Sequence, residues 1–248
     1  MYNIPEAARI SKGKPIVNLI KVDPNEKVQA VIPVKEFDDI HYLLFATKKG
    51  LIKKTNLSEY GNPRQGGIIA INLNPGDEVI EVILTEGKQQ ILMASKNGQA
   101  VKFSEQDVRI VGRASVGVRG IRLAKDDEVI GMIIARDHET VLTITENGYG
   151  KRSNLDEYRF INRGGKGVRN IICSPRNGKV VDIKAVKDDD EIMVVSEKGI
   201  LIRIPAQNIS VIGRNTQGVT IMKLEPKDKV VSIAKVEASE NGEEKIAK

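Results

Sequence analysis

Apolar and polar positions follow one pattern that recurs four times along this chain. Each copy has an apolar run, a short polar turn that ends in glycine, and a second strand-like run that carries a basic residue. The turn glycines are Gly50, Gly98, Gly148 and Gly199, which are 48, 50 and 51 residues apart. No helical periodicity of useful length competes with this pattern, which is typical of antiparallel β-hairpins.

Two of these hairpins carry an Asn-Gly dipeptide at the turn, at residues 97–98 and 147–148. Asn-Gly favours two-residue hairpin turns in which both central residues have positive φ. The runs that enter the turns, such as residues 91–94 and 192–195, are apolar on both faces. We therefore expect these strands to be buried between two sheets.

A second recurring element follows the hairpins and has the form Arg-x-x-x-Gly. It begins at Arg113, Arg163 and Arg214, with a looser copy at Arg9, and in the second repeat Arg64 comes one place late. A third element, an acidic or Asn-Gly turn leading into a valine-rich strand, completes each unit. Each unit thus supplies about four short strands over roughly 50 residues, the period of propeller-like blades.

The repeats predict an all-β, propeller-like chain of about five four-stranded blades, as a ring or an open arc. The expected repeats are about residues 1–50, 51–98, 99–148, 149–199 and 200–236, which together form one domain. One blade cannot bury both of its faces alone, so neighbouring blades must stack around a centre. Residues 237–248 break the pattern and are polar, so we expect a disordered tail.

Composition narrows the picture further. The 248 residues are 40% hydrophobic but only 4% aromatic, without tryptophan, so the core must be aliphatic. The single cysteine, Cys173, excludes an internal disulfide and favours a reducing, cytoplasmic location. No apolar run is long enough to cross a membrane. The net charge is +6, with −2 on the tail and +8 on the repeats, which points to a polyanionic partner.

Catalytic chemistry finds little support in these residues. His41 and His138 are isolated loop residues, and Cys173 is expected to be a buried, inert thiol. No cysteine–histidine cluster has zinc spacing, and residues 188–191 lack the glycine of a calcium loop. We therefore expect no catalytic residue, no metal and no cofactor.

Basic residues recur at equivalent positions after the turn glycines and in the Arg-x-x-x-Gly element. On blades arranged around a centre these positions share one rim, which predicts a cationic belt that binds a duplex without reading bases. Few aromatic residues are available for base stacking, which argues against single-strand binding. The candidate DNA-binding residues are Arg9, Lys12, Lys14, Lys53, Lys54, Arg64, Lys102, Arg113, Arg119, Arg122, Lys151, Arg152, Arg163, Lys166, Arg169, Arg203 and Arg214.

Two other functional classes stay open at this point. A propeller-like protein–protein scaffold could carry an incidental basic surface, but a protein interface does not need the same charge on every blade. An enzymatic propeller needs acids or metal ligands that converge near the centre, and the repeats offer none that recur there.

The chain resembles the C-terminal domain of the gyrase A protein of DNA gyrase, a type IIA topoisomerase. The resemblance is carried by residues 2–7 with 15–19, 117–123, 147–152 and 209–219, in the family's order along nearly the whole chain. It implies a β-pinwheel, a six-bladed propeller variant whose blades exchange strands and whose rim wraps duplex DNA. It further implies that the partners are a cleavage core and an ATPase subunit, which hold the catalytic tyrosine and the ATP site.

The chain departs from the family at its start. The family's first blade carries a box of glutamine, two arginines, two glycines, a basic residue and a further glycine, which is needed for full wrapping, and we expect that blade to be missing from this sequence. The nearest internal match, residues 162–168, lacks the glutamine and one arginine. Whether the chain supports supercoiling is therefore open, and the related, more degenerate domain of topoisomerase IV is an alternative.

Overall fold

The computed structural model describes residues 11–13, 15, 18, 26, 28–63 and 67–236. These residues form antiparallel sheets and short 3-10 turns, so the all-β prediction is confirmed. The strands are β1 (Tyr42–Thr47), β2 (Leu51–Asn56), β3 (Val79–Thr85), β4 (Gln90–Ser95), β5 (Gln99–Ser104), β6 (Val118–Arg119), β7 (Val129–Ile134), β8 (Thr140–Thr145), β9 (Tyr149–Asn154), β10 (Val168–Arg169), β11 (Val180–Val186), β12 (Glu191–Ser196), β13 (Leu201–Pro205), β14 (Val219–Thr220) and β15 (Val230–Val236). The 3-10 turns are η2 (Leu57–Tyr60), η3 (Glu105–Asp107), η4 (Leu155–Glu157) and η5 (Ala206–Asn208).

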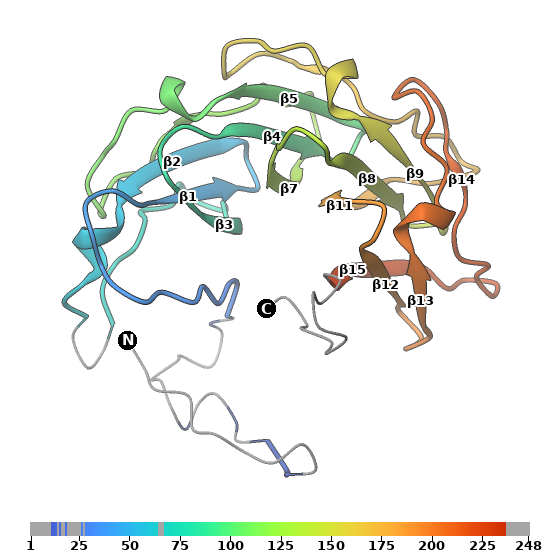
Figure 1. Cartoon of the computed structure of the whole chain (residues 1–248), viewed down its shortest axis with the longest axis horizontal. Coiled ribbons are helices and arrows are strands. Elements are labelled where there is room, and N and C mark those ends of the chain that lie inside the picture. The colour runs from blue at the N-terminus through green and yellow to red at the C-terminus, as the bar shows by residue number, and fades with distance from the viewer. Residues whose placement is uncertain are drawn as a thin grey trace.

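The sheets are arranged as blades along an open arc (Figure 1). From the inside of the arc outward, their strand orders are β3-β1-β2-β6, β7-β4-β5-β10, β11-β8-β9-β14 and β15-β12-β13. The first three sheets therefore have four strands and the last has three. The propeller-like architecture predicted from the repeats is confirmed, but the described residues form four blades where about five were expected, and the last has three strands where four were expected.

The outermost strand of each four-stranded sheet comes from the next unit along the chain. β6 pairs with β2, β10 with β5, and β14 with β9. In these three sheets the carbonyl of the turn glycine supports this pairing; that of Gly98 accepts the N–H groups of Asn170 and Ile171 at 2.8 and 3.3 Å. The exchange of strands between blades, which the family resemblance implied, is thus present.

The hairpins form as predicted, but their turns differ from the predicted type. In the β4–β5 hairpin, Ala94 pairs with Ala100, and the N–H of Gly98 donates to the carbonyl of Ser95 at 2.9 Å. Gly98 has φ of +83°, whereas Asn97 does not have positive φ. The turn is a longer one that needs the left-handed conformation only at glycine. The expectation of positive φ at both Asn and Gly is wrong.

The aliphatic core lies between successive sheets. On β4, Ile91 and Met93 pack in the cluster shared with the first sheet, while Leu92 and Ala94 pack in the cluster shared with the third. All four are fully buried. Alternate side chains of one strand thus serve two interfaces, as the apolar character of both faces predicted.

The sheets are offset from the repeats as drawn from glycine to glycine. Each turn glycine lies inside a sheet, between the two strands of its hairpin, so a boundary placed there divides that hairpin. The four sheets account for residues 42–236 of the described chain. Most of residues 1–27 and all of residues 237–248 lie outside the described residues.

Candidate nucleic-acid interface

The outer rim consists of residues 108–119, 158–169 and 209–220. The three segments lie along β2, β5 and β9, respectively. Each is joined to that strand by a parallel bridge near its start and by β6, β10 or β14 at its end. Of the predicted contacts, Arg119, Lys166 and Arg169 are exposed on this rim, and Arg122 is exposed just beyond β6. These four side chains lie on the outer edges of the first two sheets, as the belt hypothesis requires.

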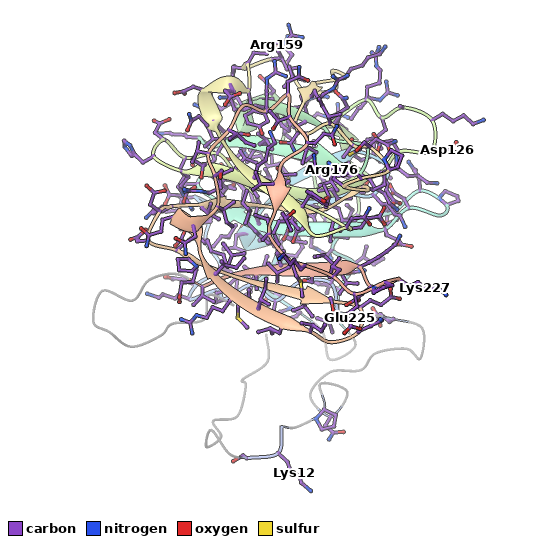
Figure 2. The ribbon with its side chains drawn as sticks, turned by 90° about the vertical axis from the view of Figure 1, so that its right-hand side faces the viewer. Lys12, Asp126, Arg159, Arg176, Glu225 and Lys227 are labelled. Atoms are coloured by element: carbon purple, nitrogen blue, oxygen red, sulfur yellow. The ribbon has the colours of Figure 1, made fainter. Side chains whose placement is uncertain are left out.

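Arg109 and Arg159 are two further exposed cations on the rim, and the sequence prediction missed them. Each follows a buried residue, Val108 or Tyr158, whose side chain fixes the backbone beside it. Figure 2 shows Arg159 projecting away from the body at the outer side of the arc. The available signal was an arginine that recurs four places before the Arg-x-x-x-Gly arginine.

The arginines of the Arg-x-x-x-Gly element are half-buried and bind the backbone of the preceding unit. Arg163 donates through Nη1 to the carbonyl of Arg119 at 3.1 Å and through Nε to that of Asp107 at 2.7 Å. Arg113 and Arg214 make the equivalent Nη1 bonds at 2.6 and 2.9 Å. Because a guanidinium has five N–H donors, each arginine can hold the rim and still offer donors to a phosphate.

Five of the predicted contacts are buried, and the expectation that they present charge to the surface is wrong. Lys53, Lys54, Lys102, Lys151 and Arg152 have exposed fractions of 0, 4, 9, 0 and 4%. They lie on β2, β5 and β9, whose outer edges are covered by the rim segments of the next unit. Their burial is a direct consequence of strand exchange.

Three of the buried cations are tied to the 3-10 turn of the following unit. Lys54 Nζ lies 3.0 Å from Glu105 Oε1 in η3, and Lys102 Nζ donates to the carbonyl of Leu155 in η4 at 2.8 Å. Arg152 Nε donates to the carbonyl of Ile209, the residue after η5, at 2.9 Å. Buried charges require such partners, so these recurring cations connect neighbouring blades.

Lys53 and Lys151 occupy the neighbouring strand position and hold the rim loops from within. Lys53 Nζ donates to the carbonyl of Arg113, and Lys151 Nζ donates to the carbonyl of Gly213 and to Ser153 Oγ, both at 2.9 Å. Burial, which disfavours the charged ammonium, lowers the pKa of both lysines to about 8.

These two lysines predict an unusual pH dependence of stability. Between pH 8 and the ordinary lysine pKa of 10.5, the unfolded chain binds protons that the folded chain lacks. The free energy of unfolding should therefore rise with pH across this window. In urea titrations, the double variant Lys53→Met/Lys151→Met is expected to be less stable and to lose most of this rise. The variant Lys187→Met, at an exposed position, should keep it, and parallel profiles for all three proteins would contradict the assignment.

Of the remaining candidates, Arg203 and Lys12 lie outside the three rim segments. Arg203 is exposed on β13 and pairs with Glu191, its Nε lying 2.7 Å from the carboxylate. Lys12 is exposed. Three candidates lie outside the described residues: Arg9, Lys14 and Arg64.

The residues considered for catalysis are dispersed. His41 Nδ1 lies 2.6 Å from Asp38 Oδ2, and His138 is exposed in a loop. Cys173 is half-buried, and burial raises the pKa of its thiol. Within the described part of the chain, no group of three His, Cys, Asp or Glu residues could hold a metal ion. No helix in that same part is long and apolar enough to cross a membrane.

A comparison with protein families decides the relationship. The model for the DNA gyrase C-terminal domain, a beta-propeller, matches residues 1–35, 41–86, 89–136, 139–187 and 190–237. Each of the last four stretches contains the three inner strands of one sheet. The chain belongs to the DNA gyrase C-terminal domain family.

Relatives of this gyrase domain are found among gyrase A proteins. The chain is 49% identical over 235 residues to the DNA gyrase A protein of Clostridium acetobutylicum, covering 95% of the chain and 28% of that protein. It is 52% identical over 240 residues to the gyrase A protein of Halalkalibacterium halodurans, covering 97% and 29%. The chain thus spans less than a third of the length of these relatives.

Solved structures share the arrangement of the gyrase domain. A C-terminal domain of DNA topoisomerase IV superposes with a TM-score of 0.86 at 30% identity, covering 91% of this chain and 71% of that one. A DNA gyrase A C-terminal domain superposes with a TM-score of 0.82 at 30% identity, covering 91% and 75%. The fold is therefore common to both types of topoisomerase.

Proposed function

We propose that the chain binds duplex DNA along its outer rim and bends the duplex around the arc. In this role it is a non-catalytic module of a cytoplasmic DNA gyrase, supporting ATP-dependent negative supercoiling by a cleavage core and an ATPase subunit. Residues 1–236 form the DNA-binding domain, with residues 237–248 as a polar tail. A topoisomerase IV parent is the alternative, since the fold serves both, but the identity of 49% and 52% to gyrase A proteins favours gyrase.

The observation that carries this proposal is the placement of exposed arginines at equivalent points on successive rim segments. Arg109 and Arg159 stand at one such pair of positions, and Arg119 and Arg169 at another, on the outermost strands β6 and β10. Positive charges that repeat along a convex edge can contact the phosphates of a bent duplex at successive points. Such contacts address phosphates and carry no sequence information.

The salt dependence of duplex binding tests the proposal directly. With about eight phosphate contacts, the plot of log Kobs against log salt concentration should have a slope of about −7. Energy transfer between dyes at the ends of the duplex should rise on binding, because the ends approach each other. A slope near zero, or binding without any change in energy transfer, would contradict DNA wrapping and favour a protein-binding scaffold.

A further inference from the structure

Each described rim segment carries an exposed apolar side chain at the same place. Ile110, Phe160 and Val211 are 51, 54 and 43% exposed. All three form the parallel bridge to the preceding sheet, and they are 50 and 51 residues apart in the sequence. Single exposed apolar residues are common on protein surfaces, but repetition at one structural position indicates a shared role.

The backbone around these side chains is held firmly, so they stand out in fixed positions. The N–H of the residue that follows each of them donates to a backbone carbonyl of β2, β5 or β9. The distances are 2.9 Å from Val111, 3.0 Å from Ile161 and 2.9 Å from Ile212. Two residues earlier, Val108 and Tyr158 are buried. The chain is thus anchored on both sides of each apolar side chain, which lowers the ordering cost of binding.

The hydrophobic cores between the described sheets do not include these three side chains. The apolar side chains at Ile110, Phe160 and Val211 therefore add little to the cores between sheets. A contact with a partner explains them better than packing does.

Charge around these positions identifies the class of partner. Arg109 and Arg113 flank Ile110 in the sequence, and Arg159 and Arg163 flank Phe160. In a DNA strand, each deoxyribose lies between two phosphates and presents a C–H surface. An apolar side chain between arginines matches that alternation, with guanidinium groups on phosphates and the apolar group on the sugar.

We propose that Ile110, Phe160 and Val211 contact deoxyribose sugars and give the rim a preference for DNA over RNA-containing duplexes. This inference rests on the proposed function. A ribose places a 2′-hydroxyl on the sugar, and covering that group with an apolar side chain removes its hydration without a replacement hydrogen bond. The scarcity of aromatic residues agrees with contacts to sugars, since base stacking needs aromatic rings.

The test compares one sequence as a DNA duplex and as an RNA–DNA hybrid, by fluorescence anisotropy with the 248-residue chain. The wild type is expected to bind the DNA duplex about tenfold more tightly, because the apolar contacts penalise the 2′-hydroxyls. The triple variant Ile110→Ser/Phe160→Ser/Val211→Ser should lose about tenfold in DNA affinity and little in hybrid affinity, so that the preference disappears. Its salt slope should stay unchanged, because the phosphate contacts remain.

A matched control is Val231→Ser, at an apolar residue that is 50% exposed on the innermost strand β15, and this variant should keep the preference for DNA. Thermal melting should show all the variants folded, since the substituted side chains are exposed. Equal affinity of the wild type for both duplexes, an undiminished preference in the triple variant, or a lower salt slope in that variant would overturn the sugar contact alone. Failure of the wild type to bind DNA would overturn the proposed function and this inference with it.

Discussion

The variant Gly148→Ala is expected to destabilise the chain by roughly 2–5 kcal/mol. Gly148 has φ of +78°, a conformation that costs an L-residue about 1–2 kcal/mol. A Cβ there would lie 2.2 Å from the carbonyl oxygen of Met222, and the backbone shift it forces adds about 1–3 kcal/mol. In a chain of this size the melting temperature should fall by roughly 5–15 °C, measured by calorimetry.

Gly199 supplies the matched control for this prediction. It is the equivalent turn glycine of the last sheet, with φ of +82°, and no described atom lies within 4 Å of a Cβ built on it. Gly199→Ala should therefore cost only the backbone term, about 1–2 kcal/mol. Equal destabilisation by the two variants would show that close contact between blades does not constrain Gly148.

The contrast between Gly148 and Gly199 shows how far the sequence alone could predict the fold. The recurring glycines located the hairpins, because a tight turn needs a residue that tolerates positive φ. They did not reveal that Gly50, Gly98 and Gly148 also make room for the segment of the next unit that follows β6, β10 or β14. Close approach between segments far apart in the chain leaves no local pattern, so the strand pairing had to come from the structure or from the family resemblance.

The basic residues show the same limit for the site. Lys53 and Arg119 both recur in equivalent places, and both suggested a surface charge. The structure buries Lys53 under the rim and exposes Arg119 on it. Burial depends on which strand covers the outer edge of the hairpin, and the exchanged strand comes from residues more than 60 positions later. A lysine in a hairpin considered alone would be exposed.

The half-buried arginines are intermediate between the buried Lys53 and the exposed Arg119. Arg163 was predicted as a phosphate contact, and the structure gives it two bonds to backbone carbonyls. Its loss would therefore change the shape of the rim as well as its charge. A clean test of the DNA interface must instead use arginines whose side chains are exposed, and the rim offers four at two equivalent positions.

The quadruple variant of these four rim arginines is expected to lose roughly a thousandfold in duplex affinity at 0.1 M salt. Each neutralised phosphate contributes about 0.9 to the salt slope, so four lost contacts should change the slope from about −7 to about −3. Glutamine keeps much of the side-chain length. Backbone hydrogen bonds and the half-buried arginines such as Arg163 hold the rim segments, and Arg169 also donates to Asn215 Oδ1 on the next rim segment at 3.0 Å. The substitutions are Arg109→Gln, Arg119→Gln, Arg159→Gln and Arg169→Gln.

A control variant that loses the same charge away from the rim distinguishes an effect of the rim arginines from an effect of net charge. The control quadruple variant removes four exposed lysines from turns and loops that precede or follow inner strands: Lys88→Gln, Lys125→Gln, Lys187→Gln and Lys227→Gln. Its slope should stay near that of the wild type, because diffuse attraction by net charge is screened within about 10 Å at 0.1 M salt. If both quadruple variants lost affinity equally, DNA would be attracted by overall charge, and the outer rim would not be its path.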